Sequence, residues 1–179
     1  MYRMAWVAAL AALSLTACSG KPGQDAAGAV QGFLAAVHAN DRAAFEADID
    51  RAALRRDLRS QIVELGRAAG LEVDGGPSEF TLDRMIGPDN FHLVQAESGA
   101  PLAAPPTLEQ VRPLLKPVDG SHVCLHGPLP QQPCVLTFER QKAGGKDPAA
   151  QARTAGWRLV RMPATDLRIE VGAEPPAKK

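Results

Sequence analysis

Residues 121–140, SHVCLHGPLPQQPCVLTFER, decide the fold class, because they have the composition of two strands joined by a turn. The segments SHVCLH and CVLTFER are rich in β-branched and apolar residues, and the stretch between them is rich in proline. This pattern is typical of a β-hairpin. Two similar segments, GWRLVRM (156–162) and DLRIEV (166–171), follow. The C-terminal part of the chain therefore predicts an antiparallel meander of four strands.

Upstream of the hairpin, apolar residues recur at the spacing of an amphipathic helix. The first helix is predicted to stop near Asn40, a residue that tolerates the left-handed conformation. Asp41 is a suitable N-cap for a short helix that runs through Asp48. The apolar stripe of the first helix consists of Val30, Phe33, Leu34 and Val37.

The best-defined helix start in the chain lies at Asp50. This residue is a good N-cap, and Ile49 before it can pack against Leu54 as a hydrophobic staple. A long helix is therefore predicted from residue 51 to a point near Gly70. Its predicted apolar face consists of Leu54, Leu58, Ile62 and Leu65.

Three shorter elements are predicted between this helix and the hairpin. Ser78 is placed to cap a helix that ends at the following Gly-Pro pair. Residues 91–94 are predicted to form a short turn of helix. Thr107 and Gln110 fit a capping box, which predicts a short helix within residues 107–115.

The helices precede the strands along the chain, which is typical of an α+β fold rather than of alternating βαβ units. We therefore expect N-terminal helices packed on a C-terminal antiparallel β-meander. One domain is predicted over residues 26–172, followed by a disordered tail at 173–179.

The first twenty residues, MYRMAWVAALAALSLTACSG, have the layout of an export signal. Arg3 supplies positive charge, and residues 5–15 form an apolar run that is shorter than the roughly 20 residues of a membrane-spanning helix. The run ends in Leu-Thr-Ala-Cys, which resembles the lipobox of bacterial lipoproteins. The resemblance implies a signal peptide at 1–17, a lipid on Cys18 and a lipidated tether at 18–25.

The lipobox also implies a location in the bacterial cell envelope, with the domain anchored to a membrane and facing the periplasm. In lipoproteins an aspartate after the cysteine favours the inner membrane, so Ser19 favours the outer one. The alternative is an ordinary secretory peptide cleaved at an A-x-A-like site, with Cys18 left as a thiol.

Residues 33–58, FLAAVHANDRAAFEADIDRAALRRDL, together with the tryptophan segment GWRLVRM, resemble an uncharacterised family of proteobacterial envelope proteins, a domain of unknown function. That resemblance implies helices followed by a sheet, and no established activity. The same order is similar to the cone-shaped folds related to nuclear transport factor 2, which would imply a ligand pocket. The apolar residues proposed to line such a pocket are Phe33, Leu58, Phe138 and Trp157.

With Cys18 lipidated, Cys124 and Cys134 remain, and disulfides persist in oxidising compartments. A hairpin centred on Leu129 places these two cysteines directly opposite each other, at a Cβ separation of about 4.5–5.5 Å that is close to disulfide geometry. A disulfide is therefore predicted. A redox-active pair is less favoured, because thioredoxin-like chemistry uses a Cys-x-x-Cys motif.

A zinc site that adds His122 and His126 to the two cysteines is the other alternative. On a flat strand these histidines lie about 13 Å apart, whereas zinc needs ligand distances of about 2.0–2.3 Å. No metal and no cofactor are therefore predicted.

Charge and motifs exclude several other classes. The 20 basic residues balance 20 acidic ones, which argues against nucleic-acid binding. The sequence AGGKDP lacks the remainder of a phosphate loop, and neither G-x-S-x-G nor H-E-x-x-H occurs. His38 and His92 are predicted to be surface or half-buried residues.

Two charged clusters have competing interpretations. Glu46, Asp48 and Asp50 could perform acid–base chemistry, but they also fit a helix cap and a solvated helix end. A second cluster forms a basic stripe, which could face an anionic partner such as lipid headgroups or be a solvated face balanced by Asp48, Asp57 or the sheet. The stripe consists of Arg51, Arg55 and Arg59.

The sequence thus predicts a lipid-anchored cell-envelope protein with a structural or accessory role and no catalytic activity. Its expected partners are the membrane, through Cys18, and other envelope proteins. A binder of a small apolar ligand, in a pocket between the helices and the sheet, is the alternative.

Overall fold

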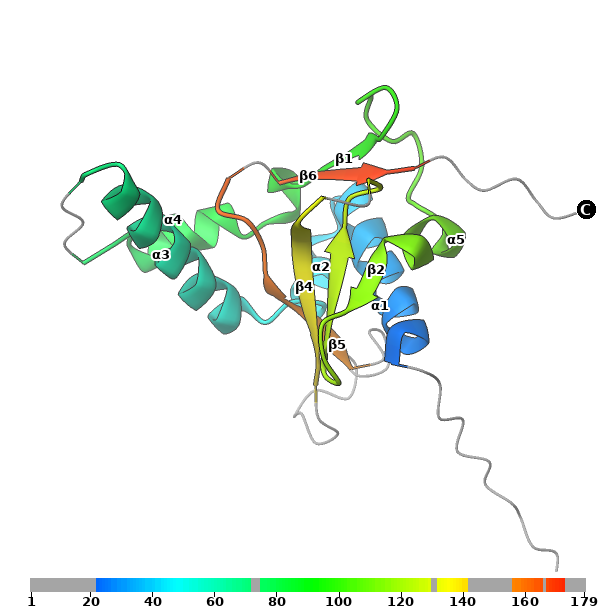
Figure 1. Cartoon of the computed structure of the whole chain (residues 1–179), viewed down its shortest axis with the longest axis horizontal. Coiled ribbons are helices and arrows are strands. Elements are labelled where there is room, and N and C mark those ends of the chain that lie inside the picture. The colour runs from blue at the N-terminus through cyan, green and yellow to red at the C-terminus, as the bar shows by residue number, and fades with distance from the viewer. Residues whose placement is uncertain (1–21, 72–74, 130–131, 142–155, 166, 173–179) are drawn as a thin grey trace, which may run out of the picture.

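The protein has the predicted mixed architecture of helices followed by an antiparallel sheet (Figure 1). The structure is a computed structural model of the 179-residue chain and describes residues 22–71, 75–129, 132–141, 156–165 and 167–172. The α+β prediction is therefore confirmed. The described helices are α1 (Pro22–His38), α2 (Arg42–Ala47), α3 (Arg51–Ala68), α4 (Glu79–Met85), η1 (Pro88–Asn90, 3₁₀), α5 (Leu108–Val111) and η2 (Arg112–Leu114, 3₁₀).

The predicted N-caps are confirmed, because each capping side chain accepts a hydrogen bond from a backbone N–H of the helix that follows. These caps are Asp41, Asp50, Ser78 and Thr107, and the last forms a complete capping box with Gln110. Asn40 has a φ of 51°, as expected for the left-handed residue that ends α1.

The start of α1 corrects the predicted tether. The helix begins at Pro22, so residues 22–25 belong to it and not to the segment 18–25 that was predicted to be a tether. Proline is favoured in the first helical turn, because its fixed φ suits the helix and its missing N–H has no partner there.

The end of α3 corrects the predicted apolar face of that helix. Leu54 and Leu58 are buried, but Leu65 is 53% exposed. The chain leaves α3 through a Schellman motif, in which Gly70 donates to Arg67 O and Leu71 donates to Gly66 O, both at 2.9 Å. Apolar residues on either side of a Schellman motif commonly contact each other. An exposed leucine at position 65 therefore fits a helix end that extends beyond the core.

The central sheet is a four-stranded antiparallel meander in the order β2-β3-β4-β5. Its first strand was not predicted, because residues 107–115 were expected to be helical. Pro113 lacks the N–H that would continue α5, so the chain passes through η2 and becomes extended at Leu115. The strands are β2 (Leu115–Pro117), β3 (His122–His126), β4 (Cys134–Arg140) and β5 (Trp157–Arg161).

Two further strands form a separate parallel pair, β1 (His92–Gln95) and β6 (Arg168–Val171). Residues 91–94 were predicted to be helical, and that prediction is wrong. Residues 166–171 were predicted to be the fourth strand of the meander; a strand does form there, but it pairs with β1 and not with the meander. The hydrogen-bonding partner of β1 lies more than seventy residues away, and no local pattern reveals such a partner.

The core lies between α1 and one face of the meander. Phe33 of α1 is its centre, with ring centroids 5.5 Å from Phe45, 5.6 Å from Phe91 and 5.4 Å from Phe138. The segment before α3 covers the edge of the sheet, because Asp50 N donates to Leu159 O at 2.9 Å. This contact occupies part of an edge strand that would otherwise be open to pairing.

Candidate functional site

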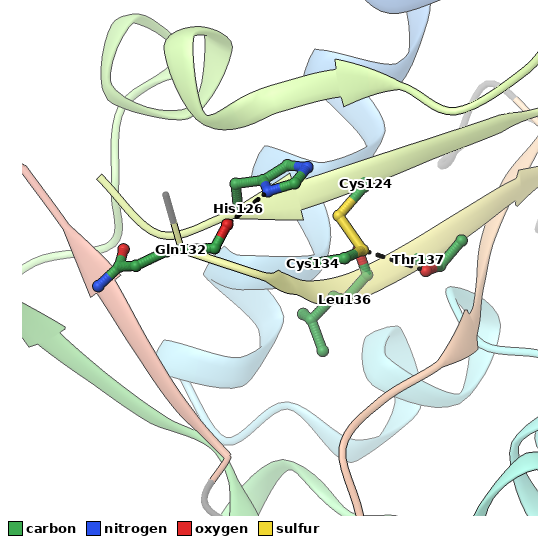
Figure 2. The surroundings of a disulfide bond; sticks show 6 residues. All are labelled: Cys124, His126, Gln132, Cys134, Leu136 and Thr137. Atoms are coloured by element: carbon green, nitrogen blue, oxygen red, sulfur yellow. Dashed lines mark hydrogen bonds between the residues drawn. A yellow bond between two sulfur atoms is a disulfide. The ribbon is translucent and has the colours of Figure 1, made fainter. Parts of the chain in front are cut away.

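The structure contains the expected disulfide between Cys124 and Cys134, whose Cα atoms are 5.6 Å apart. The predicted register is wrong, however. Cys124 lies opposite Thr137, and Cys134 lies opposite His126, with an irregularity between Leu125 and His126. The disulfide therefore joins the two strands diagonally and not directly across the ladder (Figure 2).

The two sulfur atoms have different environments. Cys124 is 1% exposed, whereas Cys134 is an exposed residue at the start of β4. The Cys134 sulfur lies 3.4 Å from Thr137 Oγ1 (Figure 2), and because a disulfide sulfur carries no proton, only the hydroxyl can donate in this contact. An external thiolate can therefore reach Cys134 but not Cys124, and its attack would release a buried sulfur, which is a poor leaving group.

The two histidines of β3 have separate partners. His122 Nδ1 lies 2.8 Å from Asp119 Oδ2, while His126 Nδ1 lies 3.1 Å from the Gln132 carbonyl oxygen, to which it can only donate (Figure 2). The two rings therefore do not converge on a shared site. Among the residues that the structure describes, no group of three or more His, Cys, Asp or Glu side chains is arranged to hold a metal ion.

The turn between β2 and β3 brings together Asp119, Ser121 and His122, the residue types of a hydrolytic triad. Their geometry differs from a triad, because the carboxylate and the Ser121 hydroxyl both contact the same ring nitrogen, His122 Nδ1. The Ser121 backbone N–H, followed by the His122 side chain, lowers the pKa of Asp119 to about 2. The carboxylate thus holds the turn through hydrogen bonds to its ionised form.

The basic stripe of α3 lies against the acidic face of α4. Arg55 donates twice to Asp83, at 2.7 and 2.8 Å, and Arg59 contacts Glu79. Arg51 donates to Asp83 at 3.0 Å and also contacts Glu46. The stripe is therefore balanced by α4 and by the end of α2, not by Asp57 as the sequence suggested.

These ion pairs shift the pKa values of Asp83 and Arg51. The Arg55 hydrogen bond, followed by that of Arg51, lowers the pKa of Asp83. The Glu46 hydrogen bond raises the pKa of Arg51, against the opposing effect of burial. Asp57 pairs instead with Arg161 of β5 at 3.0 Å. The network thus fixes α4 on α3 and α3 on the sheet.

The other polar residues singled out in the sequence also occupy structural positions. Asp50 caps α3, Glu46 pairs with Arg51, and Asp48 is a buried carboxylate whose backbone carbonyl accepts from Leu159 N at 2.9 Å. His38 Nε2 lies 3.2 Å from the Leu102 carbonyl oxygen, and His92 is exposed at the start of β1.

Three of the surface cavities are lined by described residues alone. The smallest, about 210 Å³, lies beside Cys134 and is bordered by Asp57, Gln61 and Arg161. The largest, about 470 Å³, lies between α2, α4 and η1. None of the three is lined by the four residues proposed for an apolar pocket, which pack in the core: Phe33, Leu58, Phe138 and Trp157.

The cavity between α2, α4 and η1 was not predicted from the sequence. Its wall contains Phe80 and Arg84 of α4, and Phe80 is 70% exposed. One signal was available: Phe80 lies off the apolar stripe of its helix, which runs through Leu82 and Ile86. An aromatic residue outside the buried face of a helix indicates a surface role.

The predicted lipid attachment site, Cys18, lies outside the described residues, as do the signal peptide 1–17 and the tail 173–179. Among the described helices, none has both the length and the apolar character needed to cross a membrane.

Comparison with protein-family models, with curated proteins and with solved structures finds no match to this chain. Function is therefore inferred from the residues and their geometry.

Proposed function

We propose that the protein is a lipid-anchored domain of the bacterial cell envelope that faces the periplasm, works through contacts with other proteins and catalyses no reaction. The observation that carries the proposal is the disulfide between Cys124 and Cys134. Disulfides persist in oxidising compartments and are rare in the cytosol. The lipobox that ends at Cys18 supports export independently.

Two signals of different origin thus point to the same compartment. The lipobox is a local sequence pattern, whereas the disulfide depends on how β3 and β4 pair. An acylated N-terminal cysteine would attach the domain stably, because each buried methylene contributes about 0.8 kcal/mol and more than one chain is needed.

A non-catalytic role is supported by the contacts of the polar side chains. Of the carboxylates that the sequence offered for acid–base chemistry, Asp50 caps α3 and Glu46 pairs with Arg51. The Asp119 carboxylate, which the structure adds, holds the turn before β3. The interior between α1 and the sheet is filled by the aromatic cluster around Phe33. What the protein offers to a partner is therefore its surface.

The test expresses the full-length chain in a Gram-negative bacterium and compares it with a Cys18→Ser variant and a Ser19→Ala control. We expect the wild type and the control to be recovered with membranes, and Cys18→Ser to lose membrane recovery. The intact mass should match a chain that starts at Cys18 and carries three acyl groups, and it should increase by two hydrogens on reduction.

The opposite results would contradict the proposal. They are a wild-type chain that keeps Met1 and remains in the cytoplasm, or one whose Cys124 and Cys134 react with an alkylating reagent before reduction. A variant that replaces Ser19 by Asp should move the protein from the outer to the inner membrane, which sucrose-gradient fractionation measures.

A further inference from the structure

The α3–α4 pair projects from the sheet at one end of the molecule (Figure 1). The cavity between α2, α4 and η1 lies at the base of α4. The cavity of about 470 Å³ has a charged wall and an apolar wall. The apolar wall includes Ile86, Pro88 and the ring of Phe80. This volume falls within the range of sites that take a small molecule or a few side chains.

The charges that line the cavity balance, with Arg42, Arg51 and Arg84 against the three carboxylates of Glu46, Asp83 and Asp89. Arg42 pairs with Asp89, Arg51 with Glu46 and Asp83, and further along α3 the arginines 55 and 59 pair with Asp83 and Glu79. None of these salt bridges includes Arg84, so the ion pairs are unevenly distributed around the cavity.

Arg84 is the arginine without a carboxylate partner among the described residues around the cavity. Its guanidinium carbon lies 5.9 Å from the centroid of the Phe80 ring. Its backbone carbonyl accepts a hydrogen bond from Asn90 Nδ2 at 2.9 Å. A cation stacked on a ring keeps its N–H donors free at the edge, where a planar anion can accept two hydrogen bonds.

Phe80 is the second unexplained group. The other exposed apolar residues of this region, Leu65 and Leu71, are at the Schellman motif that ends α3, whereas Phe80 is 70% exposed and caps nothing. An exposed aromatic side chain beside an arginine is the composition found at the energetic centres of protein interfaces.

We propose that this cavity is a docking site for a peptide segment of another envelope protein, one that presents a carboxylate next to an aromatic side chain. The carboxylate pairs with Arg84, and the aromatic ring contacts Phe80 and the apolar wall. The inference rests on the proposed function, because it specifies the surface and the partner chemistry through which an accessory protein would work.

The pattern of ion pairs favours a peptide over a membrane surface. Recognition of anionic lipid headgroups typically uses clusters of four to eight basic side chains. Here Arg51, Arg55 and Arg59 are already paired with carboxylates, and Arg84 is the cation of the cavity lining that is left for a ligand. One carboxylate matches one guanidinium, and a side chain can enter a cavity that a flat membrane cannot.

The experiment measures fluorescence anisotropy of three labelled ten-residue Gly-Ser peptides, whose central pair is Glu-Phe, Gln-Phe or Glu-Ala, with the full-length protein in detergent. We expect the Glu-Phe peptide to bind about fivefold or more tightly than the other two. Arg84→Gln should abolish the preference for Glu over Gln, and Phe80→Ala the preference for Phe over Ala.

Matched substitutions control for general effects. Arg67→Gln removes an exposed arginine from the same helical pair, and Leu71→Ala removes an exposed apolar side chain, so both should bind as the wild type does. Thermal unfolding confirms that each variant folds.

Two results would overturn the proposal: equal binding of the three peptides, or unchanged selectivity in Arg84→Gln. A third result would also overturn it: the protein binds micelles of labelled phosphatidylglycerol through Arg84 but does not discriminate among the peptides. That result would assign the surface to lipid headgroups. Membrane recovery from cells is measured separately. An unanchored protein that still selects the Glu-Phe peptide therefore fails only the proposed function, and an anchored one without selectivity fails only this inference.

Discussion

Cys124 and Cys134 are bonded to each other, although neither is the partner of the other in the strand register. Cys124 faces Thr137 and Cys134 faces His126. The bond therefore closes the chain across the β-bulge between Leu125 and His126 and constrains it together with the two strands.

The first prediction concerns the stability that this bond provides. Replacing both cysteines by serine should lower the free energy of unfolding by about 2–3 kcal/mol, the value that the chain-entropy model gives for a short closed loop. Urea denaturation with and without a reducing agent measures it. The reductant should destabilise the wild type by a similar amount and leave the double variant unchanged, and equal stability of all four samples would refute the prediction.

The second prediction compares one substitution at two phenylalanines. Phe33→Ala should cost about 3–5 kcal/mol, because the side chain is fully buried and its removal leaves a cavity among three aromatic rings. Phe80→Ala should change the stability by less than about 0.5 kcal/mol, because this ring is 70% exposed. Chemical denaturation of both variants checks the difference. A large loss in Phe80→Ala would show that the ring supports the fold.

Features that depend on neighbours in the sequence could be predicted. The caps at Asp41, Asp50, Ser78 and Thr107 need only a side chain and the next helical turn. Strand segments also emerged from composition, and so did the pair of cysteines. The bulge was not visible, because a shift of strand register changes no residue type and is fixed by packing across the whole sheet.

Features that depend on distant segments could not be predicted. The pairing of β1 with β6 places His92 opposite Arg168, and neither segment contains a sequence pattern that identifies the other as its partner. The arginine stripe of α3 was recognised, but its partners on α4 depend on the packing of two helices. Glu79 and Asp83 are four residues apart, which is the spacing that matches such a stripe. That spacing was the available signal.

The third prediction tests this arginine–carboxylate network. Asp83→Asn should lower the free energy of unfolding by less than about 1 kcal/mol at pH 7, because the carboxylate is partly exposed and solvent weakens its ion pairs. The folded state lowers the pKa of Asp83 below its ordinary value of 3.8, mainly through Arg55, so the stabilisation is present above that pH.

The stabilisation is lost as the pH falls through the folded-state pKa. The difference between the wild type and Asp83→Asn should therefore disappear in acid, and it should also shrink in 1 M salt, where the screening length falls to about 3 Å. Urea denaturation across pH and salt measures both trends. A difference that is the same at every pH would show that the carboxylate charge contributes nothing.

The fourth prediction concerns the turn between β2 and β3. The Asp119 carboxylate should titrate near pH 2, because it accepts hydrogen bonds from the Ser121 backbone N–H at 2.7 Å and from the His122 side chain at 2.8 Å. The ¹³C shift of its carboxyl carbon, followed from pH 1 to pH 6, measures the pKa. In His122→Phe the imidazole contact is lost while the backbone N–H remains, so the pKa should rise part of the way toward its ordinary value of 3.8.

Asp89, which is exposed, provides a second carboxyl resonance in the same spectra. Titration of Asp119 at its ordinary pKa in the wild type would mean that the turn is open in solution, and that the carboxylate does not hold the start of β3 in place.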